Sequence, residues 1–441
     1  MPTRRHIGGA AEGSTLRVGI VAPPFLPVPP PGYGGIERVV SLLADGLVAR
    51  GHDVTMFAAA GSVTNARVVT PLAIPPVLGD PESLADDLFH TTAAYLEAES
   101  FDVVHDHTGL GPALGALLRE HPPVLHTLHG PWTARARRLY GVLHDRIHLV
   151  AISRAQRAAN PALRYAGVVY NGIDLAAHPF NPEKEDFLVY VGRVSPEKRP
   201  ELAVEIAHRA KRRLVMIVKR SEPAEQAYWD AVVAPRLDGT VEVLDQPPHD
   251  VKVDVMGRAR AMLFPIDWPE PFGLVMAEAM ACGTPVIARP LGAAPEVVVD
   301  GVTGYLRTTM DGMVDAVSAA GDLAPEACRL RAELCFSGDA MVDAYERTYR
   351  AILGGEPTHA GVGGRHAAGS GGRTGGVGRH AAGGGRTGGV GRHAASAGGD
   401  GGRPGGDGGR PGGDGGRPEA PSAAWPGRAA RAPEPATSEP A

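Results

Sequence analysis

The chain has 441 residues, 43% of them hydrophobic, which is enough for two or three domains with sizeable cores. The formal net charge of −5 is mild, so it neither favours nor excludes an anionic partner. The three cysteines lack the spacing of a metal site or a disulfide framework and favour small buried thiols in a reduced cytosol: Cys282, Cys328 and Cys335.

The N-terminal segment MPTRRHIGGAAEGST (residues 1–15) carries two arginines but lacks the apolar segment of a signal peptide, and we expect it to be disordered. No run elsewhere approaches the roughly 18 apolar residues that a membrane span needs. We therefore expect a cytoplasmic protein. A basic, partly apolar helix face would still allow peripheral membrane contact.

Residues 16–174 alternate short apolar runs with amphipathic stretches. LRVGIVAP is typical of a buried strand, and GGIERVVSLLADGLVARG after it has apolar residues at helical spacing. Further strands are predicted at DVTMFAA, FDVVHDH, PVLHTLH and HLVAI, with helices at 112–118 and 134–144. Strand–helix alternation implies right-handed βαβ units, and so an N-terminal Rossmann-like domain with a parallel sheet covered on both faces.

The pattern restarts after the polar link DLAAHPFNPEKED, and we assign residues 175–335 to a second Rossmann-like domain. FLVYVG opens this series of strands, and RLVMIV, TVEVL, ARAMLFP and TPVIA continue it. Helices are predicted at 201–211, 224–233, 252–258 and 272–281. The predicted fold class is α/β, with two doubly wound domains facing a cleft where ligands meet the carboxyl ends of the strands.

A last helix is predicted at 336–353, where four large side chains recur at helical spacing: Met341, Tyr345, Tyr349 and Ile352. Residues 354–441 are mainly Gly, Arg, Pro, Ala and His in short repeats, and we expect this tail to be disordered because it cannot form a core.

Arg-rich glycine tracts bind RNA in other proteins, so the tail raises the question of a nucleic-acid partner. Against it, Trp425 is the tail's one residue suited to stacking on a base. Acidic residues also alternate with the arginines, at Asp400, Asp407 and Asp414. We therefore expect no nucleic-acid partner.

The loop after the first strand, PFLPVPPPGYGGIE, places Gly34 and Gly35 at the start of a helix. Backbone amides and the helix dipole at such a place suit a phosphate group. A glycine pair before a helix is equally a turn device, and a GxGxxG dinucleotide motif is absent.

A second loop, GRVSPEKRP, follows FLVYVG. Its Arg193 and Lys198 lie where two cations can clamp a diphosphate. The alternative is a solvated loop in which Glu197 is an ion-pair partner.

EPFGLVMAEAM (270–280) places two carboxylates, Glu270 and Glu278, eight residues apart in an apolar stretch. Pro271 suits the first helical position, so we expect Glu270 at the N-cap and Glu278 about two turns further on. Ionised carboxylates accept paired hydrogen bonds from vicinal hydroxyls, which suits a polyol ligand. Plain capping by Glu270 and a solvent-facing Glu278 are the alternatives. The first turn would also offer the backbone N–H groups of Phe272, Gly273 and Leu274.

Six segments, in this order, resemble the retaining GT-B glycosyltransferases of family 4 (glycosyl transferases group 1): GGIERVVSLLADGLVARGHDV, HTLHG, VYNGID, GRVSPEKRP, PEPFGLVMAEAMACGTPVIA and DGVTGYL. The resemblance covers about residues 16–353, and the block with the two glutamates is its specific part. It implies metal-independent transfer of a hexosyl group, with retention of configuration and no cofactor. The partners would be a nucleotide-sugar donor and an acceptor glycan, lipid or small molecule.

The resemblance also implies roles for single residues. Glu278 would bind the ribose hydroxyls, and Glu270 would hold the sugar hydroxyls together with the Phe272–Leu274 amides. Arg193 and Lys198 would neutralise the diphosphate, and Gly35 would bring its amide to it from the N-terminal domain. His129 of HTLHG would line the cleft beside the transferred sugar.

The family has no settled enzymic nucleophile, so Glu270 is not given that role. A front-face displacement, in which the leaving phosphate helps to deprotonate the acceptor, fits a site of cations and hydroxyl binders. The last helix would cross back to pack on the first domain. One departure is VKRSEP, where many relatives have a glycine-rich turn. Lys219 and Arg220 there would either add to phosphate binding or be exposed, so the base is not predicted.

HDH at 105–107 suggests a metal site at first sight. In a strand, however, His105 and His107 share a side while Asp106 points to the other. No DxD motif follows a strand either, so we expect no metal ion.

Two other functions fit the same sequence. A sugar phosphorylase or nucleotide-sugar epimerase of this fold would work without a separate acceptor alcohol. A non-enzymatic nucleotide-sugar or RNA-binding protein would act through the Arg/Gly tail.

Overall fold

The structure is a computed structural model that describes residues 14–77, 80, 83–117 and 122–354. The disorder predicted for the C-terminal tail, and for all but the end of the 1–15 segment, concerns residues outside this part. Within it, no helix combines the length and the apolarity that crossing a lipid bilayer would require.

The first half of the chain forms a parallel sheet in the order β3-β2-β1-β4-β5-β6-β7. Its strands are β1 Arg17–Val21, β2 Asp53–Phe57, β3 Arg67–Val69, β4 Val103–Asp106, β5 Val124–Leu128, β6 His148–Ala151 and β7 Tyr165–Val168. The helices between them are α1 Gly35–Ala49, α2 Ser83–Leu96, α3 Gly111–Leu117, α4 Ala134–Leu143 and α5 Arg154–Ala158.

The second half forms another parallel sheet, in the order β10-β9-β8-β11-β12-β13. Its strands are β8 Phe187–Arg193, β9 Arg213–Lys219, β10 Val241–Asp245, β11 Ala261–Phe264, β12 Val286–Ala288 and β13 Gly304–Leu306. The helices are α6 Pro200–Ala210, α7 Pro223–Tyr228, α8 His249–Arg258, α9 Leu274–Ala281, α10 Ala294–Val297, α11 Met310–Ala319 and α12 Pro325–Phe336.

Both sheets are covered on both faces, which explains why their central strands are continuous apolar runs. Side chains alternate between the faces along a strand, so Val103 of β4 joins the core under α1 while Val104 joins the core under α2 and α3. In the second half, α6 and α11 cover one face, and α8, α9 and α12 cover the other.

The helix predicted at 224–233 is interrupted. Regular α-helix ends at Tyr228, and Trp229–Val233 forms a π-helical turn. Pro235 follows directly, lacks an N–H, and its ring would collide with the carbonyl of Ala231 in a regular helix, which favours the wider turn.

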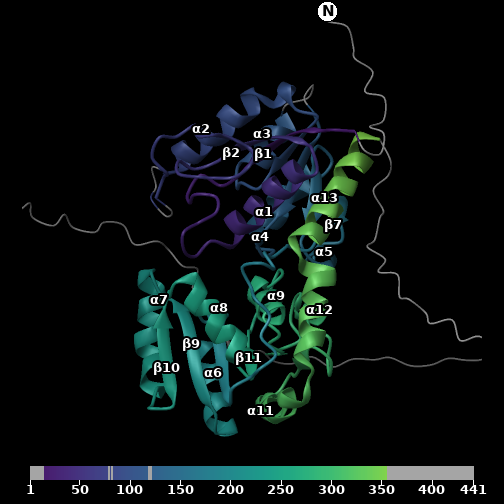
Figure 1. The fold of residues 1–441 in the computed structure, drawn as a ribbon. Coiled ribbons are helices and arrows are strands. Elements are labelled where there is room, and N and C mark those ends of the chain that lie inside the picture. The colour runs from purple at the N-terminus through teal and green to yellow at the C-terminus, as the bar shows by residue number, and fades with distance from the viewer. Residues whose placement is uncertain (1–13, 78–79, 81–82, 118–121, 355–441) are drawn as a thin grey trace, which may run out of the picture. The chain divides into compact units, whose positions relative to one another are not determined.

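The last helix, α13 (Gly338–Leu353), lies beside α1 and β7 of the first half (Figure 1). Its Tyr345 and Tyr349 are fully buried in the core of that half. The chain therefore returns to its first sheet after completing the second.

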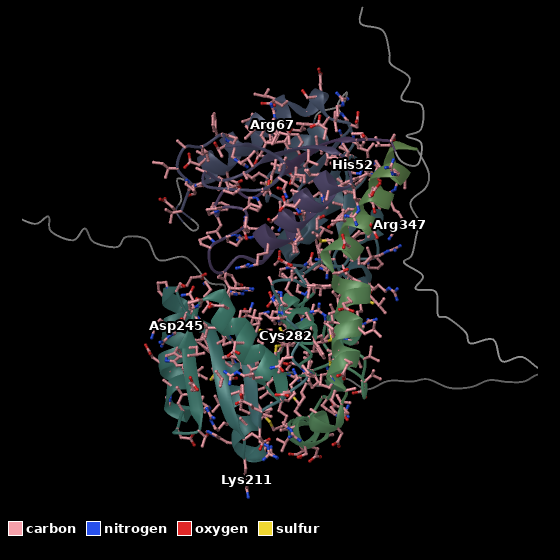
Figure 2. The ribbon with its side chains drawn as sticks, viewed as in Figure 1. His52, Arg67, Lys211, Asp245, Cys282 and Arg347 are labelled. Carbon is pink, nitrogen blue, oxygen red and sulfur yellow. The ribbon has the colours of Figure 1, made fainter. Side chains whose placement is uncertain are left out.

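The cysteines lie in the second half, at the end of α9 and in α12. Cys282, labelled in Figure 2, is fully buried at the end of α9, and Cys328 is buried in α12. Cys335 is only half-buried, so the expected burial holds for two of the three thiols.

Candidate active site

The two adjacent glycines lie close to neighbouring side chains. A Cβ at Gly34 would lie 2.6 Å from Pro30 Cγ and 2.9 Å from Glu37 Oε2. A Cβ at Gly35 would lie 3.2 Å from Leu274 Cδ1, at the start of α9. The first turn of α1, from the first half, therefore lies against the first turn of α9, from the second.

The start of α9 differs from the prediction. The helix begins at Leu274, with Gly273 as its N-cap at φ 83°, so Glu270 is not the N-cap and Glu278 lies only one turn into the helix. The backbone of Glu270 is held elsewhere, since its N–H donates to Trp268 O (2.9 Å) and its carbonyl accepts from Ala293 N (2.8 Å). The left-handed conformation of Gly273 then prevents the helix from extending back to Pro271.

The buried carboxylate of Glu270 accepts a hydrogen bond from Lys198, which lies in the GRVSPEKRP loop after β8. Lys198 Nζ donates to Glu270 Oε2, and Trp268 Nε1 donates to the same oxygen at 2.9 Å. The ammonium also lies 4.8 Å from the centroid of the Trp268 ring. Two predicted residues are thus brought together, as an ion pair that the sequence did not indicate. Phe272, from the same segment, packs its ring into the core against Tyr170 and Phe336.

Arg193 and Lys219, at the ends of β8 and β9, share the buried carboxylate of Glu225. Arg193 Nη1 lies 3.7 Å from Glu225 Oε1, and Lys219 Nζ lies 3.0 Å from Oε2. Arg193 also pairs with Glu197 at 3.2 Å, as the solvated-loop alternative expected. Two of the cations thus lie side by side at the carboxyl end of the second sheet, where parallel sheets bind ligands.

Tyr33, next to the glycine pair, reaches this cluster from the first half. Its ring centroid lies 5.5 Å from Lys219 Nζ. Tyr33 is 57% exposed as a residue, yet desolvation of its hydroxyl by the surrounding loops raises the pKa of that group. Arg193 and Lys219 lower this pKa, and Glu270 and Glu225 raise it again. The hydroxyl is therefore within electrostatic range of both cations and both carboxylates.

Lys219 and Arg220 are adjacent in sequence but contact different groups. Arg220 Nε donates to Asp245 at 2.8 Å, at the end of the edge strand β10, where Figure 2 labels Asp245. Its guanidinium stacks on Trp229, 4.6 Å from the ring centroid. Lys219 belongs to the site, and Arg220 to the edge of the sheet.

Glu278 is buried, not solvent-facing, and Lys252 of α8 donates to it at 2.6 Å. His178 Nε2 lies 4.0 Å from its other oxygen. Burial alone would raise the pKa of Glu278, but the charges of Lys252, His178 and Arg38 outweigh it and lower the pKa to about 2. Glu278 is therefore ionised at neutral pH. Arg38 belongs to α1, so the first half also acts on this carboxylate.

His129 follows β5 in the first half and is half-buried. Its Nε2 lies 2.9 Å from His107 Nδ1, after β4. Within the described residues, no hydrogen bond or ion pair joins His129 to Glu270, Lys198 or Arg193. Its place in the cleft beside the transferred sugar therefore stays a prediction.

The neighbouring histidines, His105 and His126, are in hydrogen-bond contact with other side chains of the protein. His105 is hydrogen-bonded to Tyr349 and Thr127, and His126 contacts Asp106 at 3.2 Å. Across the described part of the chain, no group of three or more His, Cys, Asp or Glu side chains is arranged to hold a metal ion.

Several site residues were missed by sequence reasoning. The only signal for Tyr33 and Trp268 is that each is close in sequence to a predicted residue. Arg38 likewise follows the glycine pair by three residues, and the others come from segments that no predicted residue marks. The missed residues are Tyr33, Arg38, His178, Glu225, Lys252 and Trp268.

Two family models match the chain. The model for glycosyl transferases group 1 matches residues 174–320, and the model for glycosyltransferase family 4 matches residues 33–177. A D-inositol 3-phosphate glycosyltransferase of Mycolicibacterium smegmatis is 30% identical over 399 residues, which cover 76% of this chain and 90% of the relative.

Solved structures are similar as well. AviGT4, a glycosyltransferase involved in avilamycin A biosynthesis, superposes with a TM-score of 0.61 at 28% identity, over 77% of this chain and 98% of its own. Sucrose-phosphate synthase from Thermosynechococcus elongatus superposes with a TM-score of 0.63 over 77% of this chain and 100% of its own. At 21% identity, that second likeness bears on the fold alone.

Proposed function

The chain belongs to the group 1 glycosyltransferases, with two Rossmann-like domains of the GT-B fold, and from this premise we propose that it transfers a hexosyl group from a nucleoside-diphosphate sugar to a hydroxyl acceptor, with retention of configuration and without a metal ion. The observation that carries the proposal is the meeting of Tyr33 and Gly35 of the first half with Lys219 and Leu274 of the second.

The diphosphate end of the donor fits the cation cluster. Arg193, Lys198 and Lys219 supply three positive charges, each paired with a carboxylate of the protein itself. A diphosphate brings its own negative charges, so it can replace Glu225 and Glu270 as the partner of these cations. Stabilising the leaving group in this way is the main electrostatic task of the reaction.

The ribose end fits Glu278. Its pKa of about 2 keeps the carboxylate ionised, and an ionised carboxylate accepts hydrogen bonds from two vicinal hydroxyls. Lys252 occupies one of its oxygens at 2.6 Å. Nucleoside binding would therefore share or displace this contact.

Retention without an enzymic nucleophile requires attack on the face that the leaving group departs from. The bond between the anomeric carbon and the phosphate oxygen breaks as the acceptor oxygen bonds to that carbon. The acceptor proton passes to the leaving phosphate, which leaves no need for a base. Glu270, already bound by Lys198 and Trp268, is suited to holding sugar hydroxyls.

The acceptor is a glycan, a lipid or a small molecule. D-inositol 3-phosphate is the named substrate of the relative from Mycolicibacterium smegmatis, so it is the first compound to test. Acceptor dependence also distinguishes transfer from the alternatives, because an epimerase or phosphorylase converts its sugar without a separate alcohol.

The test begins with thermal unfolding in the presence of UDP, GDP, ADP and their sugars. A ligand that binds only the folded protein at 100 times its Kd stabilises it by about 2.7 kcal/mol, which raises Tm by several degrees. The stabilising nucleotide sugar is then incubated with candidate acceptors, with EDTA present, and the anomeric configuration of the product is read by NMR.

We expect one nucleotide series to raise Tm and product to require an acceptor. Failure of every nucleotide to raise Tm, or turnover of the donor without an acceptor, would contradict the proposal. A chain ending at Gly354 separates it from a binder that acts through the tail, since transfer should survive this deletion.

A further inference from the structure

Two pairs of polar residues bridge β4 and β5 on the face that α13 covers. His105 Nε2 lies 2.8 Å from Thr127 Oγ1, in hydrogen-bond contact. Two residues further along each of the two segments, His107 Nδ1 lies 2.9 Å from His129 Nε2, again in hydrogen-bond contact. His105 pairs with Leu125 in the strand register, so both bonds run diagonally with the same offset. The regular spacing of the strands thus sets the His107–His129 contact.

His107 is held firmly on its other sides. It is only 3% exposed, and the His105 ring lies 4.1 Å away, centroid to centroid. His105 is itself fixed by Tyr349 of α13, whose hydroxyl is 2.6 Å from Nδ1. The orientation of the His107 ring therefore follows from packing in the first half.

The bond between the two imidazoles needs one N–H and one lone pair. Both rings are neutral at neutral pH, because burial lowers the pKa of His107 well below its usual range, and desolvation of the half-buried His129 ring together with the nearby His126 lowers its pKa as well. Two arrangements are then open. Either His107 Nδ1–H donates to His129 Nε2, or His129 Nε2–H donates to His107 Nδ1.

The other ring nitrogen of His107, Nε2, distinguishes these two hydrogen-bond arrangements. His107 Nε2 is buried and has no hydrogen-bond partner among the residues that the structure describes. If His129 were the donor, this nitrogen would carry a buried, unpaired N–H, which is rare in proteins and costly. If His107 is the donor, Nε2 keeps only a lone pair.

We propose that His107 is a positioning residue that fixes His129 as the tautomer with its proton on Nδ1. His129 then accepts from His107 through Nε2 and presents Nδ1–H as a hydrogen-bond donor. On the proposed function, on which this last step rests, the donor serves an oxygen of the transferred sugar. His129 would bind and orient the sugar, and it would not act as a base through Nδ1.

The tautomer is measured directly by NMR of the full chain carrying 15N-labelled histidine. The ring nitrogens of His129 are assigned from the signals that disappear in His129→Gln. We expect Nδ1 to be protonated and Nε2 to be unprotonated in the ligand-free protein. A protonated Nε2 on His129 would overturn the proposal, whether or not the protein transfers sugar.

Two substitutions then test the positioning role. His107→Leu removes the N–H, and we expect kcat to fall about tenfold or more with little change in the donor KM. His107→Asn keeps an amide N–H near the position of Nδ1, and we expect kcat within about threefold of wild type, with the Nδ1–H tautomer of His129 retained. Wild-type kcat in His107→Leu would contradict the role.

Thr127→Val is the matched control for damage to the buried face. It removes the hydroxyl that His105 and Tyr345 contact, but it does not touch His129. We expect Tm to fall and the tautomer of His129 to stay unchanged. If Thr127→Val also changed the tautomer, general disorder of this face would explain the signal and His107 would lose its assigned role.

Discussion

Tyr33 of the first half lies against Lys219 of the second, with 5.5 Å between the ring centroid and Nζ. The contact joins the glycine loop, which begins α1, to the cations at the ends of β8 and β9. The glycine loop and the cation cluster each allow a purely structural explanation when taken alone. Their contact makes them two sides of one candidate site.

The first prediction concerns the cations of the second half. Replacing both Arg193 and Lys198 by alanine removes two charges that would stabilise the departing diphosphate. We expect kcat to fall by roughly 100-fold or more, in the range known for the loss of electrostatic stabilisers. Steady-state kinetics with the best donor of the thermal panel measures this.

Arg220→Ala is the matched control, because Arg220 is a neighbouring cation that pairs with Asp245 and stacks on Trp229 instead. Its kcat should stay close to wild type. Near-wild-type turnover in the double variant, or an equal loss in Arg220→Ala, would contradict the assignment of the cluster.

Sequence patterns predicted most of the fold because long apolar runs mark buried parallel strands. The order of strands and helices around β1, β4, β8 and β11 follows directly from such runs. The elements that were not predicted include the three-residue strands β3 and β13 and the longer helices α11 and α12. A three-residue strand is too short to show a period.

The site was predicted in part. The loops that carry Gly35 and Arg193 could be found because ligands bind at the carboxyl ends of strands. The start of α9 was placed wrongly because Pro271 is a good first residue, and only the structure shows Gly273 in a left-handed conformation. The ion pairs of both glutamates were not predictable, since Lys252 lies 26 residues from Glu278 and Lys198 lies 72 residues from Glu270.

The second prediction concerns Glu278 and donor affinity. Glu278→Gln keeps the size of the side chain but loses the charge, so it accepts weaker hydrogen bonds from ribose hydroxyls. We expect the Kd of the nucleotide to rise by about tenfold, since hydrogen bonds to a charged group contribute about 1.5–3 kcal/mol. Calorimetric titration measures it.

Glu333→Gln is the control for Glu278→Gln, because Glu333 lies on α12 and pairs with Arg329 one turn away. It should leave the Kd unchanged. Unchanged affinity in Glu278→Gln would remove the ribose role.

The third prediction uses the low pKa of Glu278. Since the pKa is about 2 in the folded protein and near 4.5 when unperturbed, the ion pair with Lys252 stabilises the fold above pH 4.5. That contribution is lost as the pH falls from 4.5 towards 2, and it is at most about 3.5 kcal/mol at about 1.4 kcal/mol per pKa unit.

Urea unfolding of wild type and Glu278→Gln between pH 7 and pH 3 measures this contribution. The deficit of the variant should shrink as the solution becomes more acidic. A deficit that is the same at pH 7 and pH 3 would mean that Glu278 is not ionised in the folded protein.

The last prediction concerns Glu296, which joins the two halves away from the cation cluster. From α10 its carboxylate accepts from the backbone N–H groups of Arg154 (2.8 Å) and Ala155 (2.6 Å) at the start of α5, and from Tyr170 Oη (2.9 Å). The N–H of Ala293, just before α10, also donates to the carbonyl of Glu270. The helix that binds the first half through Glu296 is therefore also hydrogen-bonded to the candidate active site.

Glu296→Ala removes three hydrogen bonds to a charged acceptor, and we expect the free energy of unfolding to fall by about 2 kcal/mol or more. Tyr170→Phe removes one of them and should lower it by about 1 kcal/mol. Glu333→Ala removes a carboxylate that pairs with Arg329 on α12 and should change the free energy of unfolding by less than about 1 kcal/mol, because exposed ion pairs stabilise little. Urea unfolding at neutral pH compares the three. If Glu296→Ala lowered stability no more than Glu333→Ala, the carboxylate would be a surface feature that does not hold the halves together.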